Sequence, residues 1–177
     1  IQDKINLVLK SLIDLKNLKD KNSSIKALAY QLYENNGVLK RENVSEYLKI
    51  LGQNERKILR DLGVKFGRYH VFLYKLIKPE PVLLRTLLWK NFHQKYFNLT
   101  PPTFGLNFIE DKDNRNKNFM LLCGFEKFDN YFVRIDILER LFKQIINSNS
   151  DENKEIKLVS EMLNLLGCSK DNFKKLI

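Results

Sequence analysis

The sequence predicts a mainly α-helical chain with small β elements. We expect an α+β fold in which a helical subdomain is followed by a hairpin-plus-helices subdomain. Two observations support this prediction. In the first third of the chain, apolar residues recur at helical spacing and glycines follow the segments. Later, short alternating apolar stretches and a two-residue turn pair indicate strands.

The first third of the chain is expected to be helical, with helices over about 3–18, 24–36, 42–51 and 54–62. Ser24 is a suitable N-cap for the second helix. Gly37, Gly52 and Gly63 follow the second, third and fourth segments, where a helix ends most easily on a residue without a side chain. Short helices with glycine stops are typical of a compact helical subdomain.

The pattern changes at the centre of the chain. Two short extended pieces are expected around Gly67, with apolar residues at Val64, Phe66, Val71 and Leu73. The segment 73–77 fits either a strand or a helix. A helix over about 81–97 follows, since proline is accepted in a first turn. We expect Arg85 and Lys90 on its polar faces, and an apolar face made by Leu83, Leu84, Leu87, Leu88 and Phe92.

The segment 98–118 is predicted to be a linker between subdomains 1–97 and 119–177. It contains two adjacent prolines and a charged run whose charges nearly cancel. After it, Asp129-Asn130 is a turn pair able to take positive φ, which predicts a hairpin over 123–134. Asp136 and Glu139 indicate a capping box opening a helix to about 147. The last two helices, from Ser160 and Ser169, fit a helix-turn-helix or an ordinary helical hairpin.

Positive charge is concentrated in the middle of the chain. The 177 residues include 31 Lys and Arg against 21 Asp and Glu, which gives a net charge of +10. Between Arg56 and Lys95, ten cations stand against two acids, so this segment has a net charge of +8. Such a concentration favours a polyanionic partner, nucleic acid before an anionic membrane. The alternative is a basic protein whose lysines are simply solvated.

Candidate binding residues lie within this basic segment. Cations neutralise phosphates and exposed aromatic rings stack on unpaired bases. We expect stacking from Tyr69 and phosphate contacts from Lys65, Arg68, Lys75, Lys78 and Arg85. These cations must line a common furrow to bind one strand. Phe66, Phe72 and Trp89 are also interpreted as core residues, and Arg134 as a structural partner of Asp136.

No motif for catalysis is evident. The sequence contains no phosphate-binding loop, no dinucleotide fingerprint and no nucleophile elbow. We therefore expect a non-enzymatic region with no cofactor and no metal. Cys123 and Cys168 are far apart and are expected to be reduced, which favours a cytoplasmic location. No apolar run approaches the ~20 residues that cross a bilayer, so no membrane partner is expected. The first residue is not Met, and we expect a part of a longer protein.

Several sequence blocks together resemble the C-terminal region of bacterial superfamily 2 ATP-dependent helicases related to the mitochondrial degradosome RNA helicase. They cover nearly the whole chain, in order. The most specific are Arg60-Asp-Leu-Gly-Val-Lys-Phe-Gly67 and Val133-Arg-Ile-Asp-Ile-Leu-Glu-Arg-Leu141. The others include Lys26-Ala-Leu-Ala-Tyr-Gln-Leu-Tyr-Glu34, Gly37-Val-Leu39, Leu76-Ile-Lys-Pro79, Leu84-Arg-Thr-Leu-Leu-Trp89, Cys123-Gly-Phe125 and Leu165-Leu-Gly-Cys-Ser169.

The resemblance implies a non-catalytic accessory region of a helicase that unwinds or remodels RNA with ATP. The motor domains would lie upstream and hold the ATP site, which agrees with the missing phosphate-binding loop. The expected partners are therefore nucleic acid, RNA more than DNA, and the upstream motor domains. A structural alternative is a module that braces the motor domains or docks a ribonuclease. A stand-alone winged-helix DNA regulator is a third, weaker reading, because the densest charge lies upstream of the hairpin.

Overall fold

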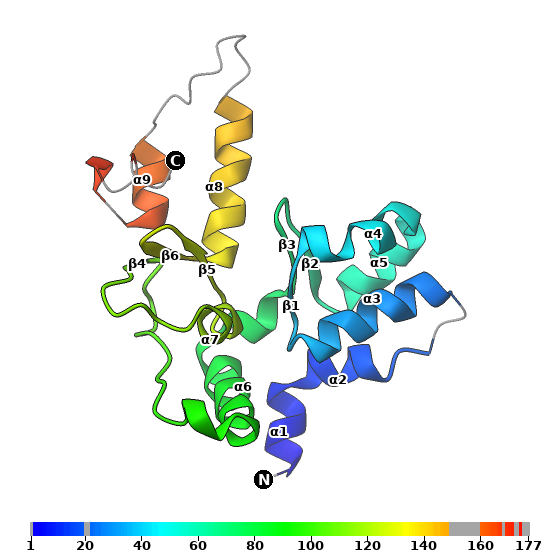
Figure 1. Cartoon of the computed structure of the whole chain (residues 1–177). Coiled ribbons are helices and arrows are strands. Elements are labelled where there is room, and N and C mark those ends of the chain that lie inside the picture. Colours follow the sequence, from blue (N-terminus) through cyan, green and yellow to red (C-terminus); the bar gives the residue numbers. More distant parts are fainter. Residues whose placement is uncertain (1, 20–21, 149–159, 168, 172–173, 175–177) are drawn as a thin grey trace. The chain divides into compact units, whose positions relative to one another are not determined.

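The computed structural model describes residues 2–19, 22–148, 160–167, 169–171 and 174 (Figure 1). The chain divides into two compact units, Ile1–Leu99 and Thr100–Ile177. Each unit combines helices with one three-stranded antiparallel sheet, so the predicted mainly helical fold with small β elements is confirmed. None of the helices in the described ranges is long and apolar enough to span a bilayer.

The first unit begins with three helices, α1 (Gln2–Val8), α2 (Lys10–Lys16) and α3 (Ser23–Glu34). The single helix predicted over 3–18 is divided at Leu9, whose φ of −97° and ψ of 15° interrupt the helical geometry. In α3, the Asn22 side chain accepts a hydrogen bond from the Ser24 backbone N–H, so Asn22 is the N-cap and the prediction of Ser24 as the cap is wrong. The predicted apolar face is confirmed, with Ile25, Leu28, Ala29 and Leu32 buried.

A sharp corner connects α3 to β1 (Val38–Lys40). Asn36 and Gly37 both take positive φ, 54° and 82°. A Cβ at Gly37 would lie 2.6 Å from Leu76 Cδ1, so glycine is needed there both for its conformation and for space. The chain continues through η1 (Arg41–Val44), α4 (Ser45–Ile50) and α5 (Gln53–Asp61).

The first sheet has the strand order β1-β3-β2, with β2 at Val64–Phe66 and β3 at His70–Leu73. The two extended pieces predicted around Gly67 are therefore present, whereas β1 was not predicted. In the register, Leu39 pairs with Val71, which pairs with Phe66. This face of the sheet packs on the helices, in a core that also contains Val64, Leu73 and the buried residues of α3.

After β3 the chain forms η2 (Tyr74–Ile77), α6 (Pro79–Phe92) and η3 (Gln94–Tyr96). In the ambiguous segment 73–77, Leu73 ends strand β3 and the other four residues form the 3-10 turn η2. The predicted orientation of the next helix is wrong. Leu83, Leu87 and Phe92 are 50%, 57% and 85% exposed, while the polar residues Arg85 and Thr86 are buried. The helix is thus rotated away from the face that its leucines predict.

The second unit contains a sheet of order β4-β6-β5. In chain order, the helices and strands of this unit are β4 (Phe108–Glu110), α7 (Lys117–Leu122), β5 (Phe125–Phe128), β6 (Tyr131–Arg134), α8 (Ile135–Ser148) and α9 (Ser160–Leu166). The predicted hairpin is confirmed, and Asp129 has a φ of 44° in its turn. Helices α8 and α9 agree with the predicted positions, but most of the helix predicted after Ser169 lies outside the described residues.

The boundaries predicted for the linker need correction. The second unit begins at Thr100, and β4 inside the segment 98–118 pairs with β6. Asp111 fixes the charged run to the hairpin. Its carboxylate accepts hydrogen bonds from Lys127 Nζ at 2.6 Å and from the Arg115 backbone N–H at 2.9 Å. Within the run, Lys112 pairs with Glu110 and Arg115 with Asp113.

Candidate nucleic-acid interface

The β2–β3 hairpin of the first unit presents three of the predicted binding residues. Val64 and Phe66 pack towards the core, so Lys65 between them points to the other face of the sheet and is exposed. The turn at the tip consists of Arg68 and Tyr69, and is closed by a 2.8 Å hydrogen bond from Gly67 N–H to the His70 carbonyl. Tyr69 is 48% exposed, which leaves one part of its ring accessible.

Arg41 holds this turn in place. Its backbone N–H donates to the Tyr69 carbonyl and its guanidinium donates to the Gly67 carbonyl, both at 2.8 Å. One residue that follows β1 thus fixes the carbonyl before the turn and a carbonyl within it. The turn therefore presents Arg68 and Tyr69 on a braced backbone.

Helix α5 adds two arginines beside β2 that the sequence analysis did not select. The guanidinium carbons of Arg56 and Arg60 lie 5.7 and 5.6 Å from the centroid of the Phe66 ring, a cation–π arrangement. Arg56 also donates to the Leu48 and Leu51 carbonyls, at 2.6 and 3.2 Å, so its role is mainly structural. Arg60 is exposed. The sequence feature that could have indicated them is the i, i+4 spacing of the two arginines, which places both on one face of a helix.

We call Arg60, Lys65, Arg68 and Tyr69 the hairpin surface. Arg60 flanks the edge strand β2 from the side of the core, Lys65 projects from its other face, and Arg68 lies at its end. Within the described part of the chain, neither Arg60 nor Lys65 forms an ion pair with a carboxylate. Their charge is therefore available to an anionic ligand.

Lys75 and Lys78 lie at the other end of β3, in and just after η2, and both are exposed. Lys78 Nζ donates to the Tyr74 hydroxyl at 2.8 Å and lies 4.4 Å from the centroid of that ring. The four residues of β3 separate this pair from the Arg68–Tyr69 turn by roughly 13 Å. The predicted cations thus form two groups along the hairpin.

Arg85 is the predicted site residue that the structure places inside the protein. It is 1% exposed, and its guanidinium donates to the Asn36 carbonyl at 2.6 Å and to the Leu76 carbonyl at 2.5 Å. These bonds satisfy carbonyls at the α3–β1 corner and in η2. Arg85 is therefore removed from the set of phosphate contacts, because its guanidinium is not accessible to a strand.

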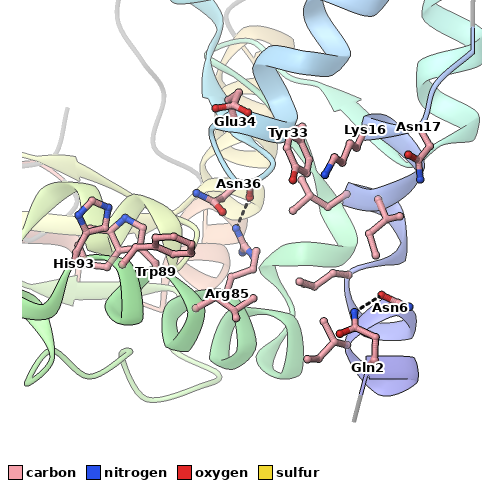
Figure 2. Close-up of a pocket in the computed structure, with 16 residues that line it drawn as sticks. Gln2, Asn6, Lys16, Asn17, Tyr33, Glu34, Asn36, Arg85, Trp89 and His93 are labelled. Atoms are coloured by element: carbon pink, nitrogen blue, oxygen red, sulfur yellow. Dashed lines mark hydrogen bonds between the residues drawn. The ribbon is translucent and has the colours of Figure 1, made fainter.

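A groove of about 740 Å³ lies in the first unit between α1, α2, α3 and α6. Arg85 is the predicted binding residue that contributes to it. Figure 2 shows Arg85 in the middle of the groove, with Trp89 and His93 on one side and Lys16 and Tyr33 on the other. Lys65, Arg68, Lys75 and Lys78 do not line this groove, so it is not the common furrow that the sequence predicted.

Three aromatic residues were interpreted as core residues and Arg134 as a structural partner of Asp136, and the structure tests each of these interpretations. Phe72 is 3% exposed and Phe66 packs against the core, which confirms their interpretation as core residues. Trp89 is half-buried. In the second unit, Arg134 Nε and Nη2 donate to the two carboxylate oxygens of Asp136 at 2.6 and 3.1 Å, which confirms the structural pairing.

In the part of the chain that the structure describes, no three His, Cys, Asp or Glu residues lie together as potential ligands. Asp111 has a shifted pKa. Burial raises the pKa of its carboxyl, but the Arg115 N–H and the Lys127 ammonium outweigh burial and lower the pKa below its ordinary value of 3.8.

Comparisons with models of known protein families, with curated proteins and with solved structures find no match.

Proposed function

We propose that the first unit binds or guides single-stranded nucleic acid, RNA in preference to DNA, through the hairpin surface. The observation that supports this proposal best is the arrangement around β2. Two arginines and a lysine surround one short edge strand, and a half-exposed tyrosine lies at its tip. Exposed cations beside an accessible ring are the combination that single strands need, because phosphates and bases alternate along the strand.

The broader proposal is that the chain is a non-catalytic accessory region of an ATP-dependent RNA helicase. It is supported by the ordered resemblance of the sequence blocks and by the absence of a phosphate-binding loop from the sequence. In such a protein, upstream motor domains would hydrolyse ATP and this region would hold or direct the strand. The hairpin surface would then contribute to affinity and strand path, with no chemical step.

The electrostatic contribution sets the expected salt dependence. Five exposed cations, the three of the hairpin surface together with Lys75 and Lys78, predict a slope of log K against log salt of about −3.5 for a single strand. Raising the salt concentration from about 50 to 200 mM would then weaken binding by roughly 100-fold. Fluorescence anisotropy with a labelled single-stranded RNA measures both the affinity and the slope.

Matched variants distinguish a specific surface from general basicity. The double variant Lys65→Ala, Arg68→Ala should weaken binding and make the slope shallower by about 1.4, since two phosphate contacts are lost. Lys26→Ala removes an exposed cation from α3 and should leave binding unchanged. Equal effects of the α3 and hairpin substitutions, or a flat response to salt, would exclude a binding surface at the hairpin.

A second candidate function is docking of a protein, either the motor domains or a ribonuclease. The observation in its favour is the exposure of Leu83 and Leu87, which lie one helical turn apart on α6. Co-purification with the motor domains of the parent helicase tests it. Loss of the complex on Leu83→Ser, Leu87→Ser, with retention on Lys65→Ala, Arg68→Ala, would favour docking over strand binding.

A further inference from the structure

The C-terminal end of α6 and the turn that follows carry a cluster of rings. We call this cluster the aromatic end of α6; it consists of Trp89, Phe92, His93, Tyr96 and Phe97. The Trp89 and Tyr96 rings are stacked, with centroids 5.2 Å apart and an interplanar angle of 16°. Phe92 and Phe97 are 85% and 67% exposed. These two large rings therefore face solvent beside a stack that is already formed.

Lysines accompany these rings. Lys95 Nζ lies 4.7 Å from the centroid of Tyr96, and Lys90 Nζ lies 5.6 Å from that of Phe97 while donating to the Leu99 carbonyl at 3.0 Å. The sequence contains no Asp or Glu between Glu80 and Glu110. The chain between these two acids is thus aromatic and cationic, while Glu34 of α3 contributes a carboxylate to the lining of the neighbouring groove.

The aromatic end of α6 opens into the groove of the first unit. Trp89, Phe92 and His93 line the groove together with Arg85. Arg85, Trp89 and Phe92 follow one another at spacings of four and three residues on α6, and His93 comes directly after the helix. Figure 2 shows Trp89 and His93 beside Arg85. Four amide side chains from α1, from the C-terminus of α2 and from the α3–β1 corner also line it, namely Gln2, Asn6, Asn17 and Asn36. Amides offer both a donor and an acceptor, which is what the edge of a nucleobase can pair with.

We infer that the aromatic end of α6 and the adjoining groove form a second contact surface for single-stranded nucleic acid. Unpaired bases stack on Phe92 and Phe97, the exposed ammonium of Lys95 meets the phosphates, and a base that enters the groove faces the amides. This inference rests on the proposed function and extends it from the hairpin surface to the other end of the basic segment. Charge favours a nucleic-acid strand over a protein here, because lysine is depleted in protein–protein interfaces while cations beside exposed rings are typical of single-strand sites.

Trp89 provides a direct test, since it is the one tryptophan in the 177-residue sequence. The full chain is titrated with a fluorescein-labelled 12-nucleotide oligoadenylate for anisotropy and with the unlabelled strand for tryptophan emission. Trp89 emission should be quenched in a saturable manner over the same concentrations at which anisotropy rises. Phe92→Ala and Phe97→Ala should each weaken binding by at least about fivefold, because each removes a stacking ring.

Leu87→Ala is the matched control, because it removes an apolar side chain that is 57% exposed on the same helix. It should leave the affinity for the strand unchanged. Circular dichroism checks that the variants are folded, which their exposed positions favour.

The outcomes separate the two proposals. Binding that depends on Lys65 and Arg68, with unchanged Trp89 emission and unaltered affinity in Phe92→Ala, would overturn the second surface and leave the hairpin surface standing. It would also make protein docking the better use of these rings. Quenching that is lost in Phe92→Ala but unaffected by Lys65→Ala, Arg68→Ala would support the second surface and refute the hairpin surface. No binding of the strand at 50 mM salt would refute both.

Discussion

Replacing Arg85 tests whether this arginine stabilises the fold or contacts a ligand. The side chain is buried, and its guanidinium donates to the Asn36 and Leu76 carbonyls. Arg85→Met keeps much of the aliphatic volume but leaves both carbonyls without this donor. A hydrogen bond from a charged group contributes roughly 1.5–3 kcal/mol, so the loss of two should destabilise the first unit by about 3–6 kcal/mol.

Urea unfolding measures this effect. Trp89 lies one helical turn from Arg85, so its emission reports unfolding of the first unit. With a slope of about 1.5 kcal/mol per molar urea, a loss of about 3 kcal/mol lowers the midpoint by roughly 2 M. Arg85→Lys can reach one carbonyl at most and should lie between the wild type and Arg85→Met. Lys75→Met, which removes an exposed cation, should stay within about 0.5 kcal/mol of the wild type.

The same variants test the original expectation that Arg85 contacts phosphate. The structural role predicts a lower urea midpoint for Arg85→Met and an unchanged affinity for RNA in the fraction that remains folded. An unchanged midpoint together with weakened RNA binding would refute the assignment of Arg85 as an internal support.

Three further predictions concern the corner, the loop and the turn. Gly37→Ala should destabilise the first unit more than Gly63→Ala in urea unfolding. Both positions have positive φ, but a Cβ at Gly37 would lie 2.6 Å from Leu76 Cδ1, whereas a Cβ at Gly63 would lie 3.9 Å from Leu73 Cδ2. Equal losses of stability would show that the positive φ alone matters. The stability of the second unit should fall as the pH drops below about 4. The pKa of Asp111 is lowered in the folded state, so its stabilising contribution is present above the ordinary pKa and is lost as the carboxyl protonates. In an acid titration followed by circular dichroism, Asp111→Asn should reduce this loss of stability, and an unchanged titration would argue against the Lys127 contact. Arg41→Ala removes the guanidinium hydrogen bond to Gly67 and should weaken RNA binding about as much as Arg68→Ala does, while Arg41→Lys should recover part of the affinity; an unaffected affinity would show that the turn does not need this brace.

The sequence was sufficient wherever a local pattern determines the structure. The apolar face of α3 and the turn at Asp129 follow from spacing and from turn chemistry. Strands β1 and β4 were missed because each has three residues and pairs with a strand far along the chain. Strand β2 is equally short, but its partner β3 follows it directly across a two-residue turn, so the apolar residues on both sides of that turn could be recognised.

The orientation of α6 could not be predicted for a related reason. Its leucines alone predict an inward apolar face, but Arg85 is drawn inside by carbonyls at a corner 49 residues away and in η2. The exposed positions of Lys65, Arg68, Lys75 and Lys78 agree with the sequence analysis, whereas their separation into two groups depends on η2 following β3. Arg60 was overlooked because its partner ring, Phe66, is brought to it by tertiary packing.

Lys65 has a consequence beyond ligand binding, because it occupies the middle residue of an edge strand. A charged residue at an open sheet edge discourages a strand of a second molecule from adding to the sheet. When this charge is neutralised, by substitution or by a bound polyanion, the protection against strand addition is reduced. Self-association of the protein at high concentration is then expected to increase in Lys65→Ala, and light scattering would detect it.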